Sequence, residues 1–151
     1  VFARQMIRGV VLQHCVVIGA DFEGFVVDDC SFESCVFIDP NFHQAHIART
    51  RFIDVLCIGD TGDLEEDLSP HVLGSFERSR LYDCLFVDVT FQNIRACGIN
   101  ADRIEMHFCD FSGSQLADTE ILRSSIVGCN FSNAGLRESR LKDTVVDGSV
   151  F

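Results

Sequence analysis

Large apolar residues recur at every fifth position along almost the whole chain, and this spacing constrains the fold more than any other feature. In CSFESCVFIDPNF, residues 30–42, it places Phe32, Phe37 and Phe42. No regular element has this period, because residues five apart lie about 140° from each other on a helix and on opposite sides of a strand. The backbone must therefore turn a corner once in every repeat.

The repeat runs in two registers, one on each side of residues 58–75. Of its 28 central positions, 25 are Phe, Leu, Ile, Val or Met, and twelve of the fourteen phenylalanines fall on them. The centres are Phe2, Ile7, Leu12, Val17, Phe22, Val27, Phe32, Phe37, Phe42, Ile47, Phe52, Cys57, Phe76, Leu81, Phe86, Phe91, Ala96, Ala101, Met106, Phe111, Leu116, Ile121, Ile126, Phe131, Leu136, Leu141, Val146 and Phe151. We expect these side chains to form the core, where each buried Phe contributes roughly 1.5–3 kcal/mol.

A small residue usually stands two positions before each centre, as Cys30 stands before Phe32. Side chains two apart point to the same side of an extended segment, so each repeat supplies one small and one large inward residue and then a corner. Four such sides close a coil of twenty residues. Residues twenty apart, such as Phe111 and Phe131, should then stack at about 4.8 Å. The pattern predicts a coil of parallel strands with four sides.

Two alanines at central positions fit the same scheme. Ala96 and Ala101 are small, but Ile94 and Ile99 stand two positions before them. Large and small residues have been exchanged within each pair, which conserves volume in a tightly packed core.

With this pattern the sequence resembles the pentapeptide-repeat family, whose loose motif is A(D/N)LXX. Matches include ADFEG (20–24), CSFES (30–34), CNFSN (129–133), AGLRE (134–138) and SRLKD (139–143), and the resemblance covers the chain except residues 58–75. It implies an all-β fold, a right-handed quadrilateral parallel β-helix of about seven coils. We expect one domain over residues 1–151, with repeat blocks at 1–57 and 76–151.

The segment 58–75, IGDTGDLEEDLSPHVLGS, interrupts the repeat and contains neither Lys nor Arg. Its acidic residues are Asp60, Asp63, Glu65, Glu66 and Asp67. The step from Cys57 to Phe76 is nineteen residues, one short of a coil. The segment is either an irregular coil or an acidic loop that leaves and re-enters the stack. The sequence favours the loop but does not decide between the two.

Charge and composition narrow the function classes. A net charge of −11 weighs against direct nucleic-acid binding, which normally requires a basic surface. No apolar run reaches the roughly 18 residues that a membrane span needs. Eight cysteines without a CxxC motif indicate reduced, buried thiols in a cytoplasmic protein rather than a disulfide scaffold. The sequence begins at Val1 rather than at methionine, which is consistent with a fragment of a longer chain.

No catalytic, cofactor or metal site is expected. His43 and His46 lie close in sequence, but a zinc site needs three or four converging ligands. Most carboxylates fall on outward positions of a convex rod, which lacks the cleft of an active site. We therefore expect a protein that is not an enzyme.

One outward face is apolar and is the candidate surface for a partner or for self-association. Its residues are Val16, Ile18, Val36, Ile38, Leu56 and Ile58. Contiguous exposed apolar patches usually mark contacts. The interrupting segment, through Leu64, Leu68, Val72 or Leu73, is an alternative cover for this face. The open ends of the coil are a second place for self-association.

Two functions follow from the fold and the resemblance. The first is a non-enzymatic protein-interaction scaffold, because rigid solenoids present flat binding faces. The alternative is a DNA mimic, since the quinolone-resistance members of the family are similar acidic rods that bind DNA gyrase or topoisomerase IV. Mixed charges in the column Asp83, Arg103, Arg123 and Asp143 disfavour the mimic, because they suggest ion pairing between coils.

Overall fold

The computed structural model of the chain describes residues 5–59, 75–92 and 94–151, and in these ranges it contains strands and turns but no helix. Each strand has three residues. The first sheet stacks β1 (Met6–Arg8), β4 (Val26–Asp28), β7 (His46–Ala48), β10 (Arg80–Tyr82), β13 (Asn100–Asp102), β15 (Glu120–Leu122) and β17 (Arg140–Lys142). The second stacks β2 (Val11–Gln13), β5 (Ser31–Glu33), β8 (Arg51–Ile53), β11 (Leu85–Val87), β14 (Glu105–His107), β16 (Ser125–Val127) and β18 (Val145–Asp147). The third stacks β3 (Val16–Ile18), β6 (Val36–Ile38), β9 (Leu56–Ile58) and β12 (Thr90–Gln92).

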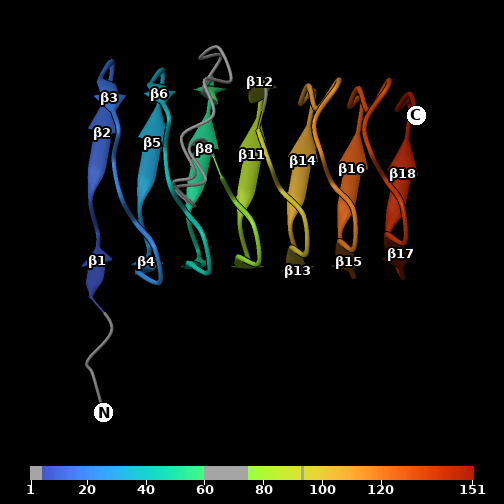
Figure 1. Cartoon of the computed structure of the whole chain (residues 1–151), viewed down its shortest axis with the longest axis horizontal. Coiled ribbons are helices and arrows are strands. Elements are labelled where there is room, and N and C mark those ends of the chain that lie inside the picture. Colours follow the sequence, from blue (N-terminus) through green and yellow to red (C-terminus); the bar gives the residue numbers. More distant parts are fainter. Residues whose placement is uncertain (1–4, 60–74, 93) are drawn as a thin grey trace, which may run out of the picture.

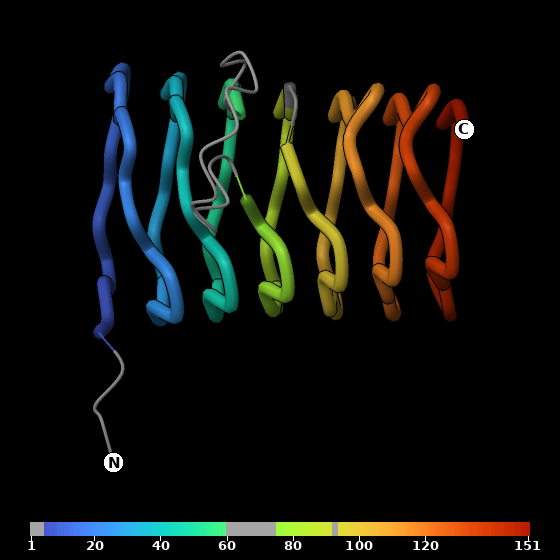
Figure 2. Tube along the Cα trace, viewed as in Figure 1, coloured from blue at the N-terminus to red at the C-terminus, as the bar shows by residue number. Residues whose placement is uncertain are grey.

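The strands wind around a common axis and form a straight rod with four sides (Figures 1 and 2). Three sides carry the sheets, and the fourth is linked by single parallel bridges such as Asp21 to Asn41 and Gln115 to Gly135. Beyond β12 the third side also continues through single bridges, from Thr90 to Asp110 and on to Asn130. The predicted all-β parallel solenoid is confirmed. Seven strands in a stack correspond to about six full turns, slightly fewer than the predicted seven coils.

Within each repeat block, paired residues are twenty apart, as Val26 is from His46. Across residues 60–74 the offset is larger: His46 pairs directly with Arg80, and Leu56 pairs with Thr90. Both offsets are 34 residues (80 − 46 and 90 − 56). The two blocks therefore stack in one continuous register with fourteen extra residues between them.

The repeat centres of the inner coils fill the interior of the rod, as predicted. Phe32, Phe37, Phe42 and Phe52 are at most 1% exposed. Phe42 stacks on Phe76 across the longer connection, with ring centroids 4.6 Å apart. The aromatic ladder therefore passes from one repeat block into the other, which supports a single core.

The prediction that the centres are buried is wrong in the last coil. Leu141, Val146 and Phe151 are 45%, 38% and 59% exposed, because no further coil covers them within the described residues.

At the corners of the coil, the chain adopts a backbone conformation that cannot be predicted from the repeat centres. At most corners between Gly9 and Gly148, the second residue after a centre has a positive φ. Most of these residues are Gly, Asp or Asn, which adopt this left-handed conformation at little cost. Phe108, with a φ of 56° and 61% exposed, is a costly exception.

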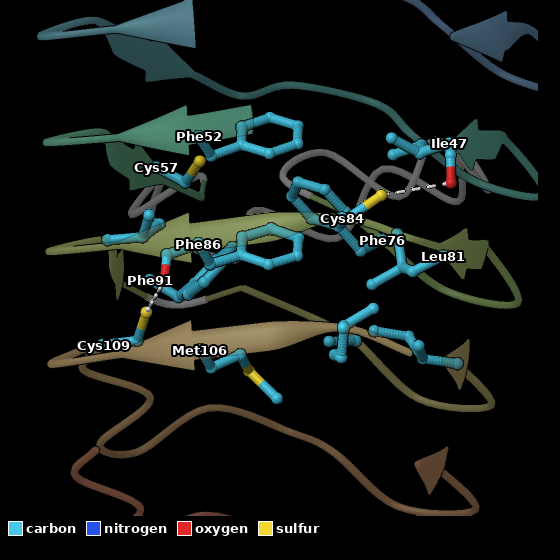
Figure 3. Close-up of a cluster of buried hydrophobic side chains, with 14 of the residues drawn as sticks. Ile47, Phe52, Cys57, Phe76, Leu81, Cys84, Phe86, Phe91, Met106 and Cys109 are labelled. Atoms are coloured by element: carbon cyan, nitrogen blue, oxygen red, sulfur yellow. Dashed lines mark hydrogen bonds between the residues drawn. The ribbon is translucent and has the colours of Figure 1, made fainter. Parts of the chain in front are cut away.

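The small inward residues make a regular set of hydrogen bonds. The Cys84 thiol donates to the carbonyl oxygen of Ile47 at 3.3 Å, and the Cys109 thiol donates to that of Phe86 at 3.6 Å (Figure 3). Ser114 and Thr119 donate in the same way to Phe91 and Ala96. These bonds explain why Cys, Ser and Thr are tolerated, as alanine is, at these buried positions, where a polar group usually needs a partner. Ser79, two positions before Leu81, is an exception, because its buried hydroxyl has no hydrogen-bond partner among the described residues.

Among the described residues, no helix has the length and apolar character to cross a membrane.

Candidate interaction surface

The predicted apolar residues form two columns on the third sheet. Val16 pairs with Val36, which pairs with Leu56. Ile18 pairs with Ile38 and Ile38 with Ile58 in the same register. The centres Val17, Phe37 and Cys57 point inward between the columns, so their neighbours on either side must point outward. We refer to the six residues Val16, Ile18, Val36, Ile38, Leu56 and Ile58 as the apolar face.

Exposure differs along the apolar face. Val16 is 64% exposed and Ile18 is 70% exposed, because they belong to the first described coil. Val36, Ile38, Leu56 and Ile58 are partly buried by neighbouring strands, yet none is fully covered by the described residues. The apolar face is therefore accessible within the described part of the chain.

The apolar face ends where the sequence of the third side becomes polar. Thr90 follows Leu56 in register, and the same column then continues with Asp110 and Asn130. The other column continues from Ile58 to Gln92. The polar half of this side supplies matched positions at which the same substitutions can be compared.

The acidic residues Asp60, Asp63, Glu65, Glu66 and Asp67 lie outside the described residues. Leu64, Leu68, Val72 and Leu73 also lie outside the described residues. From the sequence, they are the residues of the same chain that could cover the apolar face. The acidic loop and this cover both remain predictions from the sequence.

Ion pairs join adjacent coils on the outer surface. Arg103 Nε donates to Asp83 Oδ1 at 2.8 Å, and Arg123 Nε donates to Asp102 Oδ1 at 2.9 Å. The Arg123 guanidinium holds the pKa of the Asp102 carboxyl below its usual value, mainly through this hydrogen bond. Some outward carboxylates, including Asp83 and Asp102, thus have an arginine beside them, which interrupts the negative charge at these places on the rod.

One of these ion-pair clusters is largely buried. Asp28 lies on β4 and is only 7% exposed. Arg8 approaches it from the preceding coil at 3.4 Å, and Arg49 approaches from the following coil. A buried carboxylate needs such partners, because an uncompensated charge would be costly to remove from water.

A second exposed feature of the surface is a contact between Tyr82 and Arg103 that the sequence does not predict. Tyr82 on β10 is 39% exposed, and the guanidinium of Arg103 lies 4.1 Å from the centroid of its ring. The period of twenty predicts Asp83 and Arg103 as neighbours, but Tyr82 belongs to the adjacent column, so the period does not indicate its contact with Arg103.

The cysteines and histidines do not assemble a reactive centre among the described residues. Cys30, Cys35, Cys57, Cys84, Cys109 and Cys129 are buried, and Cys15 and Cys97 are partly buried; all eight are unpaired. No group of three or more His, Cys, Asp or Glu side chains in the described ranges is arranged to hold a metal ion.

Comparisons with known proteins identify the fold. No family model and no curated protein sequence matches the chain. Among solved structures, a trypsin-treated form of QnrB1, a plasmid-mediated fluoroquinolone resistance protein, matches with a TM-score of 0.54 at 15% identity, over 97% of this chain and 73% of that chain. Rfr23, a pentapeptide repeat protein from the cyanobacterium Cyanothece 51142, matches with a TM-score of 0.53 at 9% identity, over 97% of this chain and 90% of that chain. The chain therefore has the four-sided β-helix fold of the pentapeptide-repeat proteins.

Proposed function

We propose that this protein is a non-enzymatic scaffold that binds another protein through the apolar face. The observation that carries the proposal is the pair of aligned apolar columns on β3, β6 and β9, which reach 70% exposure at Ile18. Such a patch costs free energy in water, and proteins usually retain one because a partner covers it. The stacked strands hold the columns rigidly, so binding requires little ordering of the surface.

A partner suited to the apolar face presents apolar side chains on a flat or gently convex surface. The two columns stand at outward positions on either side of each strand centre. Because these positions are polar further along the third side, for instance at Asp110 and Asn130, binding would be confined to one end of the rod. The unpaired thiols are consistent with a cytoplasmic location, which forms part of the proposal.

Site-specific photocrosslinking tests this function. A photoreactive amino acid at Ile18 should crosslink to a protein in the cells that produce this chain. The same amino acid at Ser112, which lies on the polar half of the same side and is exposed, should not. A crosslink to a second copy of the chain would identify that copy as the partner. The proposal is wrong if Ser112 crosslinks as well as Ile18, or if neither position crosslinks.

Mimicry of DNA toward a topoisomerase is the second candidate. The net charge of −11 supports it, and one protein with the same fold, QnrB1, is described as a fluoroquinolone resistance protein. We rank it second because Arg103 and Arg123 pair with carboxylates on the outer surface, whereas a phosphate-like surface needs continuous negative charge. A supercoiling assay with purified DNA gyrase separates the two functions, and we expect no inhibition.

A further inference from the structure

The core of the second repeat block contains a cavity of about 170 Å³. Its walls come from four successive coils, beginning with Phe76 and ending with Phe151. Since stacked strands lie about 4.8 Å apart, four coils extend over roughly 15 Å along the axis. The cavity is therefore long and narrow, and it is open to solvent at the last coil, where the lining residues Leu141 and Phe151 are 45% and 59% exposed.

Ala96 and Ala101, the two small repeat centres, leave unfilled space near the axis of the rod. Ala101 lies in register between Leu81 and Ile121, so its methyl group replaces a large side chain in that stack. Ala96 interrupts the fourth side in the same way. Ile94 and Ile99 are buried beside them, as the sequence predicted. However, these isoleucines stand two positions before the centres, next to the corners. Ile99 contributes to the wall of the cavity, whereas Ile94 does not line it.

The side chains around this space are almost entirely apolar. Leu81, Phe86, Phe91 and Met106 converge on the same part of the core (Figure 3). Two hydroxyl groups also line the cavity, but both are already used. Thr119 Oγ1 donates to the carbonyl oxygen of Ala96 at 3.1 Å, and Ser139 Oγ donates to that of Leu116 at 2.7 Å.

A cavity of this kind is unsuited to water. A buried water molecule needs two to four polar partners, whereas apolar cavities of about 150 Å³ stay dry and take up benzene or xenon. The lining also lacks a charged side chain, so a polar or ionic ligand would lose its hydration without compensation.

We propose that the axial cavity of the second repeat block, widened by Ala96 and Ala101, is a binding site for a slender apolar molecule such as an alkyl chain. The length of the cavity favours a linear molecule, and its walls favour one without hydrogen-bonding groups. This site is separate from the apolar face, whose residues belong to the first repeat block, and it does not depend on the proposed scaffold function.

Thermal unfolding in the presence of n-hexane tests the site. A ligand that binds only the folded state raises the melting temperature as its concentration increases, so Tm of the unmodified protein should rise. Ala101→Ile places two more methyl groups and a methylene in the cavity and should abolish this rise. Ala117→Ile makes the same change at an outward, partly buried position that does not line the cavity, and the rise should persist.

Methyl NMR of the unmodified protein gives a second measurement that requires no variant. Hexane should shift the methyl signals of Leu81 and Ile121, which line the cavity, and leave those of Ile18 and Ile38 unchanged. The proposal is overturned if hexane moves neither Tm nor the Leu81 and Ile121 signals. It is also overturned if Ala101→Ile folds and responds to hexane as strongly as the unmodified protein.

Discussion

Phe111 and Phe131 stack with parallel rings, their centroids 5.0 Å apart and their planes at 0°. Phe91 lies 4.6 Å on one side of this pair, and Phe151 lies 5.0 Å from Phe131 on the other. These four residues are each twenty apart along the chain. The period of the sequence is thus converted directly into a continuous aromatic stack on one side of the rod.

This stack gives a prediction for stability. Phe131→Ala should lower the free energy of unfolding by about 3–5 kcal/mol, because it opens a cavity between two rings that cannot close around it. Ser132→Ala, at the adjacent outward position, should change it by no more than about 0.5 kcal/mol. Denaturant unfolding measures both. Similar losses for the two variants would contradict the stacked core.

The continuous register across residues 60–74 predicts that a deletion will be tolerated. His46 and Arg80 pair at an offset of 34 instead of twenty, and residues 60–73 are the fourteen that make the difference. Removing them joins Gly59 to Gly74 and restores the period of twenty. Because a shorter connection costs less entropy to close, the melting temperature should stay the same or rise slightly.

A second deletion of equal length provides the control. Removing residues 95–108 leaves the following repeats out of phase with the five-residue period and should abolish cooperative unfolding. Circular dichroism and thermal melting distinguish the outcomes. If the two deletions are equally damaging, the register described here is incorrect.

The fold and the apolar face could be predicted from the sequence because both follow from the backbone period. A repeat of five residues places Val16, Val36 and Leu56 in one column, and this placement does not depend on the conformations of their side chains. For the same reason, the sequence predicted that Ile94 would supply the large inward side chain that Ala96 lacks. The burial of Ile94 confirms this prediction.

Features that depend on side-chain reach could not be predicted in this way. Arg123 was expected in a column with Arg103 and Asp143, but it donates to Asp102, because a long flexible side chain can cross to the neighbouring column. Asp28 occupies an outward position and is nevertheless buried, since arginines from two other coils cover it.

The ion pair of Arg123 and Asp102 gives a prediction for pH dependence. The folded protein lowers the pKa of Asp102, so this carboxylate stabilises the fold above its unfolded pKa. That contribution is lost as the pH falls through the lowered folded value. Arg123→Gln should raise the Asp102 pKa toward the ordinary value, whereas Arg137→Gln, beside Glu138 on another side, should not. Carboxyl-carbon NMR titration measures the pKa in each variant, and an unchanged value in Arg123→Gln would contradict the assignment.

The cysteines should differ in reactivity according to burial. Desolvation raises the pKa of the Cys57 and Cys84 thiols to about 12, which leaves almost no reactive thiolate near neutral pH. Iodoacetamide should therefore modify Cys15 and Cys97 in the folded protein, and Cys57 and Cys84 only after unfolding. Mass spectrometry of protein labelled for increasing times tests this order, and early labelling of Cys57 would contradict its position in the core.

The most direct test of the scaffold function is the affinity for the crosslinked partner, measured with purified proteins by isothermal titration calorimetry. Ile18→Asp and Ser112→Asp place the same charge on the same side of the rod, the first within the apolar face and the second beyond it. The scaffold account predicts that Ile18→Asp weakens binding at least tenfold, which corresponds to about 1.4 kcal/mol, while Ser112→Asp leaves the affinity unchanged. Equal affinities for Ile18→Asp and the unmodified protein, with both variants folded, would contradict it.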